Sequence, residues 1–209
     1  MDRLARELGQ SLGCPAPDLA VPLLAAYADL VQTWNARTNL TGARDGPALC
    51  EVLFADALVL ADPAFISHGA RIVDVGSGVG APILPLLLVR PDLDATLVEP
   101  QRRRVAFLRT CVGTLGLAGR SRVVESRVSE QDPRVAGSPF DVALSRATLS
   151  PDRWLAMAFA LASRALVLTA AAQPPPTPEG TRLLESRRYR LPRTGAPREV
   201  TLYGSAPEV

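Results

Sequence analysis

The chain has 209 residues, of which 47% are hydrophobic and 21% are charged, so it is long enough for one well-buried globular domain. Its formal net charge of +2 is too small to indicate a nucleic-acid-binding protein by itself. The 3 cysteines stand at wide spacings and the chain has 1 histidine, which argues against a disulfide framework and a metal site. No apolar stretch reaches the roughly 18 residues of a membrane-spanning helix, and the charged N-terminus has no signal-peptide core, so we expect a cytoplasmic protein without a membrane partner.

Residues 1–69 are expected to form a helical extension packed on the core. A short helix over residues 4–12 should be followed by a longer helix that Asp18 caps. The apolar residues of the longer helix recur at helical spacing and should pack on the main domain. They include Leu19, Leu23, Tyr27, Val31 and Trp34. A further helix is expected over residues 45–60, and its inner side should carry Leu49, Val52, Leu53, Asp56 and Leu60.

A polar segment, W-N-A-R-T-N-L-T at residues 34–41, is expected directly after the longer helix. Asn and Thr side chains bond readily to their own backbone, so this segment could be plain turn chemistry. Its position beside a cofactor-binding domain could instead place it at the rim of a substrate site. His68, the single histidine, is expected to be an exposed loop residue rather than a catalytic base.

Residues 70–81, A-R-I-V-D-V-G-S-G-V-G-A, form the stretch on which the functional interpretation depends. A β-branched run up to Val75 ends abruptly in glycines, and a second such run over residues 95–98 ends at Glu99. Glycines after a parallel strand allow a tight turn and the close approach of a ligand, and the following helix presents free N–H groups. A carboxylate at the tip of the second strand can accept hydrogen bonds from both hydroxyls of a ribose. The pattern therefore predicts a site for an adenosine-type cofactor.

The glycine pattern leaves the identity of the cofactor open. The spacing Gly76-x-Gly78-x-x-Ala81 also fits the dinucleotide-binding fingerprint of nicotinamide enzymes. Asp74 inside the strand and the alternation G-x-G-x-G favour S-adenosylmethionine, because Asp74 could position the loop or approach the amino group of the methionine part. A glycine turn that only ends a strand is the purely structural alternative.

The rest of the chain alternates strands with helices, which predicts a parallel sheet covered by helices on both faces. The last two strands should form an antiparallel pair, as in methyltransferase-type folds. We therefore expect residues 70–209 to form an α/β, Rossmann-like domain with a mostly parallel seven-stranded sheet. The expected strands span residues 71–75, 95–99, 122–125, 141–144, 165–169, 189–191 and 199–203. The expected helices between them span residues 79–89, 102–115 and 151–161.

Two other features have more than one interpretation. The proline-rich segment 170–180 is either a functional flap or a disordered loop. Arginines gather at residues 102–109 and again at residues 187–193, and each cluster is either a positive binding patch or a solvated face.

Four motifs stand in order along the chain. They are W-N-A-R-T-N-L-T at 34–41, V-D-V-G-S-G-V-G-A-P at 73–82, R-R-V-A-F-L at 103–108 and F-D-V-A-L-S-R-A at 140–147. Together with R-P-D-L at 90–93, they closely resemble the RsmG (GidB) family of small-subunit ribosomal RNA guanine-N7 methyltransferases, over roughly residues 25–169. The resemblance implies a class I methyltransferase fold that uses S-adenosylmethionine.

The resemblance also implies roles for individual residues. The loop around the methionine part of the cofactor would consist of Asp74, Gly76, Ser77, Gly78 and Gly80. Glu99 would hold the ribose, while Arg127 and Val128 would border the adenine. Arg146 follows the fourth strand, at the sheet edge where parallel-sheet enzymes place active-site residues. Arg146 and Arg37 are expected to contact the substrate or the cofactor carboxylate, and for each a structural carboxylate is the alternative partner.

The function implied by the resemblance is methylation of N7 of a guanine in 16S ribosomal RNA, by a monomer that acts on the RNA or on the small ribosomal subunit. Guanine N7 attacks the sulfonium methyl through its lone pair, so positioning and electrostatics can supply most of the acceleration without a base.

The sequence departs from the family at several polar positions. The family segment H-F-L-D-S is Leu53-Phe54-Ala55-Asp56-Ala57 here, and the family segment F-P-G is Ala81-Pro82-Ile83. These departures keep two alternatives open. The chain could bind the cofactor as a non-catalytic, regulatory protein, or it could methylate another RNA or a small molecule.

Overall fold

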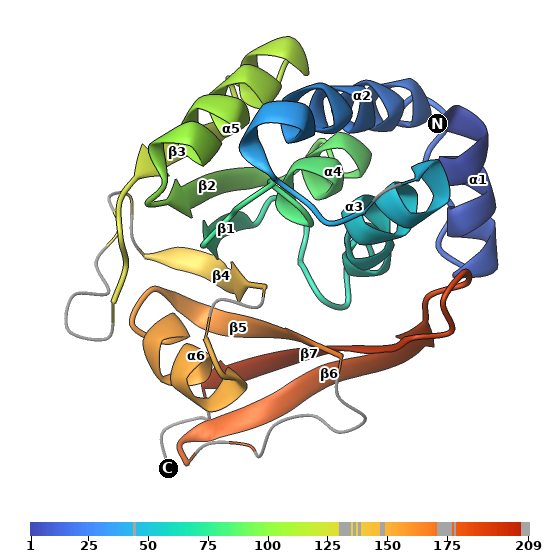
Figure 1. Cartoon of the computed structure of the whole chain (residues 1–209). Coiled ribbons are helices and arrows are strands. Elements are labelled where there is room, and N and C mark those ends of the chain that lie inside the picture. The colour runs from blue at the N-terminus through green and yellow to red at the C-terminus, as the bar shows by residue number, and fades with distance from the viewer. Residues whose placement is uncertain are drawn as a thin grey trace.

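A seven-stranded sheet forms the centre of the computed structural model (Figure 1). The structure describes residues 1–43, 45–129, 135, 137, 139–146, 149–170, 177 and 179–205. The strands are β1 (Arg71–Val75), β2 (Asp94–Glu99), β3 (Ser121–Glu125), β4 (Phe140–Ser145), β5 (Ala162–Thr169), β6 (Thr181–Arg190) and β7 (Pro197–Ser205). Their order in the sheet is β3-β2-β1-β4-β5-β7-β6.

The strand pairing confirms the fold class expected from the sequence. β1 to β5 pair in parallel, whereas β7 runs antiparallel to both β5 and β6. In this arrangement the carboxyl ends of β1, β2, β4 and β5 meet at one edge of the sheet. That edge carries the glycine loop after β1 and Glu99 at the end of β2.

Helices cover the two faces of the sheet unequally (Figure 1). The helices are α1 (Asp2–Ser11), α2 (Val21–Thr38), α3 (Gly46–Leu60), α4 (Ile83–Val89), α5 (Arg102–Thr114) and α6 (Pro151–Ala158). The first five share one core cluster with alternate residues of the strands, such as Ile72 and Leu97. α6 packs on the opposite face, where Trp154 lies among Val73, Val75 and Tyr203.

The N-terminal helices form a layer outside α4. Every residue of α4 is buried, because α2 and α3 pack against it. Among the described residues, no helix combines the length and the apolar character needed to cross a membrane. The division of the chain into an extension (1–69) and a methyltransferase domain (70–209) stays a prediction.

The structure corrects the predicted start of α2. Ala20 occupies the N-cap position, and the Asp18 carboxylate pairs with Arg6 of α1 instead of capping the helix. Leu19 is 91% exposed and Leu23 is 39% exposed, so both lie outside the buried stripe to which Tyr27 and Val31 belong. On α3, Val52 is also more exposed than predicted, at 38%, and Asp45, expected as the first residue of that helix, is its N-cap.

The polar segment 34–41 is also placed differently from the prediction, because α2 continues to Thr38. The helix ends where Asn39 adopts a left-handed conformation, with φ of 48°. The Asn35 side chain then makes two hydrogen bonds with the backbone of Thr41, at 3.0 and 2.9 Å. The amides and hydroxyls of this segment therefore serve largely as helix-end and turn chemistry.

The helix after the glycine loop begins later than predicted, at Ile83 rather than near residue 79. Gly76, Gly78 and Gly80 all have positive φ, a conformation that no α-helix contains. The predicted end of α6 is also corrected, because this helix ends at Ala158 and not at residue 161. Most of the proline-rich segment 170–180 lies outside the described residues.

Candidate functional site

The glycine loop is fixed to the neighbouring strand by its own backbone. The N–H groups of Gly76 and Ser77 both donate to the Val98 carbonyl of β2, at 2.8 and 3.1 Å. A Cβ on Gly78 would meet only the Gly76 carbonyl oxygen, at 3.7 Å, whereas a Cβ on Gly80 would lie 2.4 Å from a methyl group of Leu84. Gly78 therefore keeps space open beside the loop, and Gly80 is required by packing.

Glu99 joins the end of β2 to this loop. Its side chain is almost completely buried, and its Oε2 accepts a 2.9 Å hydrogen bond from the Gly78 N–H. Its Oε1 accepts a second hydrogen bond, also 2.9 Å long, from the Gln101 N–H. Each carboxylate oxygen retains further acceptor capacity, so the group is held in place and can still bind a hydroxyl.

A cavity of about 480 Å³ opens at this point, a size within the range of about 300 to 1,000 Å³ that small-molecule sites have. We call it the loop cavity. Its lining consists of Leu40, Gly76, Ser77, Gly78, Val79, Ala81, Glu99, Pro100, Gln101, Arg104, Arg127 and Arg146. The fold thus brings together six of the ten residues that the sequence singled out. The other four, Asp74, Gly80, Val128 and Arg37, do not line it.

Asp74 lies beneath the loop and is only 2% exposed. Its Oδ2 has no hydrogen-bond partner among the described residues. Burial raises the pKa of the Asp74 carboxyl to about 7, against the opposing effects of the Ser77 side chain and, after it, of the positive charge of Arg146. A buried acceptor without a donor is costly, so the site has unused capacity for a hydrogen-bond donor or a cation.

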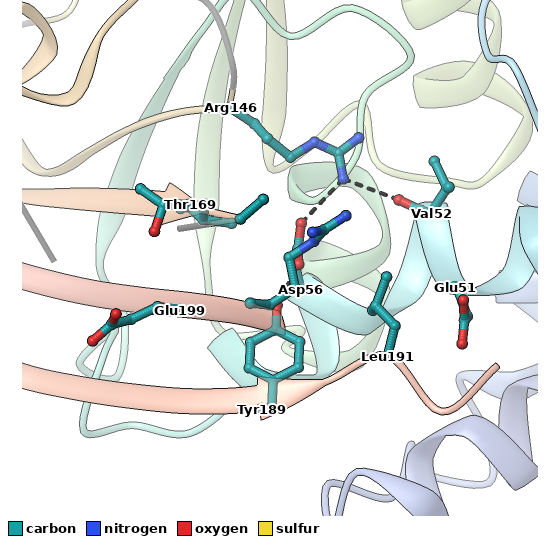
Figure 2. A pocket seen from close by; sticks show the side chains of 11 residues that line it. Glu51, Val52, Asp56, Arg146, Thr169, Tyr189, Leu191 and Glu199 are labelled. Atoms are coloured by element: carbon teal, nitrogen blue, oxygen red, sulfur yellow. Dashed lines mark hydrogen bonds and ion pairs between the residues drawn. The ribbon is translucent and has the colours of Figure 1, made fainter. Parts of the chain in front are cut away.

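A second cavity, of about 270 Å³, also has Arg146 in its lining (Figure 2). Figure 2 shows Arg146 reaching Asp56 and the Val52 carbonyl of α3, with Tyr189 on the far side of Asp56. The Arg146 Nη1 donates to Asp56 Oδ2 at 3.1 Å and to Val52 O at 3.0 Å, and the Tyr189 hydroxyl donates to Asp56 Oδ1. Arg146 therefore has the structural carboxylate that the sequence left as an alternative, and it also borders both cavities.

Two further polar atoms of the second cavity are buried without a partner among the described residues. They are the Thr169 Oγ1 and the Glu199 Oε2, on β5 and β7. These two residues face each other across the β5–β7 pairing. No local sequence signal singled them out, because their juxtaposition depends on the antiparallel register.

The sequence reasoning also missed several residues of the site. Asp56 was expected only to face inward, and its role as the partner of Arg146 joins residues 90 positions apart. Gln101 and Arg104 lie two and five residues after the acid that ends β2, and this closeness in sequence is a signal that could have indicated them. His68 is exposed, as predicted, with its side chain 77% accessible.

Arg37 lies in a different place from Arg146. It lines a groove between α2 and α5 together with Trp34 and Arg103. Its expected contact with the substrate or the cofactor carboxylate stays a prediction. The described residues contain no group of three His, Cys, Asp or Glu side chains arranged to hold a metal ion.

The chain is similar in sequence to one family of methyltransferases. A family model described as rRNA small subunit methyltransferase G (GidB) matches residues 20–169. The ribosomal RNA small subunit methyltransferase G of Myxococcus xanthus is 33% identical, and the match covers 97% of this chain and 95% of that protein. The protein of the same name from Anaeromyxobacter dehalogenans is 35% identical over 70% of this chain and 66% of its own length.

Solved structures share the fold at lower identity. A candidate RNA methyltransferase of Pyrococcus horikoshii has a TM-score of 0.55 at 15% identity, over 88% of this chain and 98% of that chain. TrmN of Thermus thermophilus has a TM-score of 0.53 at 20% identity, over 72% of this chain and 48% of that chain.

Proposed function

This chain belongs to the rRNA small subunit methyltransferase G (GidB) family, and from that premise we propose that it transfers a methyl group from S-adenosylmethionine to N7 of a guanine in 16S ribosomal RNA. The observation that best supports the proposal is the hydrogen bond between Glu99 and the Gly78 N–H. It places an acid that can hold a ribose directly against the glycine loop, at the edge of the loop cavity.

The residues present fit S-adenosylmethionine. Glu99 would accept the ribose hydroxyls through its remaining acceptor capacity. Gly78 leaves room for the close approach of the methionine part. The unpartnered Oδ2 of Asp74 offers a negative group for the cationic amino group of that part. Arg127 would border the adenine, and Val128 would lie behind it.

The proposed reaction does not require a general acid or a general base from the protein. When bound, S-adenosylmethionine supplies an electrophilic methyl group on a positively charged sulfur. Because guanine N7 reacts through a lone pair, the chain's own residues need only hold the two groups in line and exclude water. Arg146, fixed by Asp56 and Val52, is oriented to bind an oxygen of the guanine or of the cofactor carboxylate.

The proposed substrate is an unpaired or extruded guanine of the small ribosomal subunit, since only an unstacked base can enter such a site. A ribosomal substrate would place the protein in the cytoplasm. The predicted monomeric state and the role of Gly80 remain part of the proposal.

The experiment is methyl transfer with labelled S-adenosylmethionine, using intact small ribosomal subunits and naked 16S rRNA as alternative substrates, followed by mapping of the modified base. We expect label at N7 of a single guanine, and we expect Glu99→Gln to abolish most of it. The matched control is Glu125→Gln at the end of the neighbouring strand β3, which is exposed and should retain activity.

Other outcomes would replace the proposal. Tight binding of S-adenosylhomocysteine without transfer to any RNA would indicate a non-catalytic, cofactor-binding protein. Transfer to a small metabolite alone would indicate a different methyltransferase.

A further inference from the structure

A groove of about 650 Å³ lies between the C-terminal half of α2 and the first turns of α5, two helices that run side by side in Figure 1. We call it the α2–α5 groove. Its lining consists of Thr33, Trp34, Ala36, Arg37, Thr38, Arg103 and Ala106. It is separate from the loop cavity and has no part in the proposed cofactor site.

The two arginines of the groove have no partner among the residues that the structure describes. Arg37 and Arg103 are both exposed, and neither forms a hydrogen bond or an ion pair with another described residue. The arginines of the C-terminal cluster differ in this respect. Three of them pair with carboxylates of the fold: Arg187 with Asp62 at 2.6 Å, Arg188 with Glu199 at 3.3 Å and Arg193 with Asp45 at 2.9 Å. The guanidinium groups of the groove are therefore available to an external anion.

The start of α5 adds to the positive potential of the groove. Arg102, Arg103 and Arg104 are its first three residues, and its first turn has neither an acidic residue nor a side-chain cap. The N-terminus of a helix carries a partial positive charge, so three cations placed there repel the helix dipole. Arg102 has a partner in Glu125, at 3.1 Å, whereas Arg103 has none among the described residues. An anion bound in the groove would relieve this repulsion.

One aromatic residue, Trp34, lines the groove. Trp34 is half-buried, and its ring meets Phe107 of α5 edge to face, with the ring centroids 5.6 Å apart. Cations beside an aromatic surface are the combination by which proteins bind single-stranded nucleic acid, since the cations hold phosphates and the ring stacks on a base.

The groove also borders the loop cavity along both helices. On α5, Arg103 lines the groove and the next residue, Arg104, lines the cavity. At the end of α2, Thr38 lines the groove and Leu40 lines the cavity. A strand lying in the groove would therefore lead to the mouth of the cavity.

We propose that the α2–α5 groove binds an unpaired RNA strand next to the target nucleotide, with phosphates at Arg37 and Arg103 and a base against Trp34. The inference rests on the proposed function for the identity of the nucleic acid. It assigns Arg37 to RNA binding rather than to the reacting groups.

The test measures RNA binding apart from methyl transfer. A short fluorescein-labelled single-stranded RNA, and the same strand annealed to its complement, are titrated with the full chain saturated with S-adenosylhomocysteine, at several salt concentrations. The variants are Arg37→Gln, Arg103→Gln and the double variant. The matched control is Arg182→Gln, because Arg182 is exposed on the edge strand β6 and also has no ion pair among the described residues.

Each groove variant is expected to bind the single strand several-fold more weakly. Each should also lower the slope of log K against log salt by about 0.7, and the double variant by about 1.4, because each removes one phosphate contact. Arg182→Gln should leave affinity and slope unchanged. Trp34→Leu should weaken binding without altering the slope, and an unchanged affinity for S-adenosylhomocysteine will show that the variants are folded.

The results that would contradict the groove proposal differ from those that would contradict the proposed function. Equal weakening by Arg182→Gln, tighter binding of the duplex, or unchanged RNA binding by the double variant would each overturn the groove proposal. If the groove variants behave as expected while the wild-type chain methylates no RNA, the proposed function fails and the groove remains an RNA-binding site.

Discussion

The hydroxyl of Tyr27 on α2 donates a 2.6 Å hydrogen bond to the main-chain carbonyl of Val79, inside the glycine loop. Tyr27 is completely buried, so no water competes for this bond. The contact links a helix from the first 40 residues to a loop 52 positions later in the chain. An N-terminal helix thus helps to set the shape of the candidate cofactor site.

Tyr27→Phe is expected to weaken binding of S-adenosylhomocysteine. The variant keeps the ring but leaves the buried Val79 carbonyl unpaired, at a cost of about 1 to 3 kcal/mol. Part of this cost should appear as a lower free energy of unfolding and part as weaker binding, which calorimetry and urea denaturation can separate. Thr33→Val, which removes an exposed hydroxyl of the same helix, is the control. Unchanged binding by Tyr27→Phe would mean that the loop keeps its shape without this bond.

Glu99→Gln should reduce cofactor affinity by about 10- to 100-fold, because hydrogen bonds to charged groups contribute about 1.5 to 3 kcal/mol. The carboxylate accepts from two backbone N–H groups, and an amide can present an oxygen to only one of them. Titration with S-adenosylhomocysteine measures the effect. A loss no larger than that of Glu125→Gln would contradict a role for Glu99 in holding the ribose.

Gly78→Ala should lose cofactor binding, whereas Gly80→Ala should lose stability. Alanine at either position has to adopt a positive φ, which costs about 1 to 2 kcal/mol. At Gly78 the added methyl group makes only an ordinary contact with the Gly76 carbonyl oxygen, so the fold should persist while cofactor binding is lost. At Gly80 it would lie 2.4 Å from Leu84, so the fold itself should be destabilised. Thermal denaturation and binding titrations distinguish the two, and equal losses of stability would be the contrary result.

Asp74 should make stability fall as the pH rises. Its carboxyl has a pKa of about 7 in the folded chain, whereas an unfolded aspartate titrates near pH 4. Between these values the folded state holds a proton that the unfolded state has released, so each pH unit costs up to about 1.4 kcal/mol of stability. Asp74→Asn should flatten the profile of unfolding free energy between pH 5 and 7. A slope that persists in this variant would assign the effect to another group.

The same carboxyl should make cofactor affinity depend on pH in the opposite direction. A cationic amino group beside Asp74 favours the ionised form, so affinity for S-adenosylhomocysteine should rise with pH up to about 7 and then level off. Calorimetry in buffers of different ionisation enthalpy should detect proton release at pH 6. Absence of both effects would place the amino group elsewhere.

Arg146→Lys should reduce the rate of methyl transfer by about 100-fold, the order of magnitude for loss of one positioned hydrogen-bond donor, with little change in cofactor affinity. Lysine keeps the charge, but its side chain is shorter and ends in a single nitrogen, so it cannot present a planar guanidinium to a substrate while one nitrogen is held by Asp56 and Val52. Asp56→Asn should act in the same direction by loosening Arg146, and should lower kcat more than it raises KM. Normal turnover in both variants would leave Arg146 with a purely structural role.

The sequence alone determined the class of fold and the core of the candidate site. Alternating strands and helices, a glycine loop after the first strand and an acid at the end of the second are local patterns. They depend on backbone sterics and on which residues can be buried, and both are set by near neighbours. Six of the seven strands and the position of Glu99 at the loop were therefore predictable, whereas β6 was expected only over residues 189–191 and spans Thr181–Arg190.

Only the tertiary structure decided how distant side chains meet. Arg146 pairs with Asp56 across 90 positions, and Tyr27 reaches Val79, because α2 and α3 pack over α4 on one face of the sheet. The same packing separates Arg37 from Arg146 and places it in the α2–α5 groove. Such contacts depend on the relative placement of whole elements, and spacing along one segment contains no information about that placement.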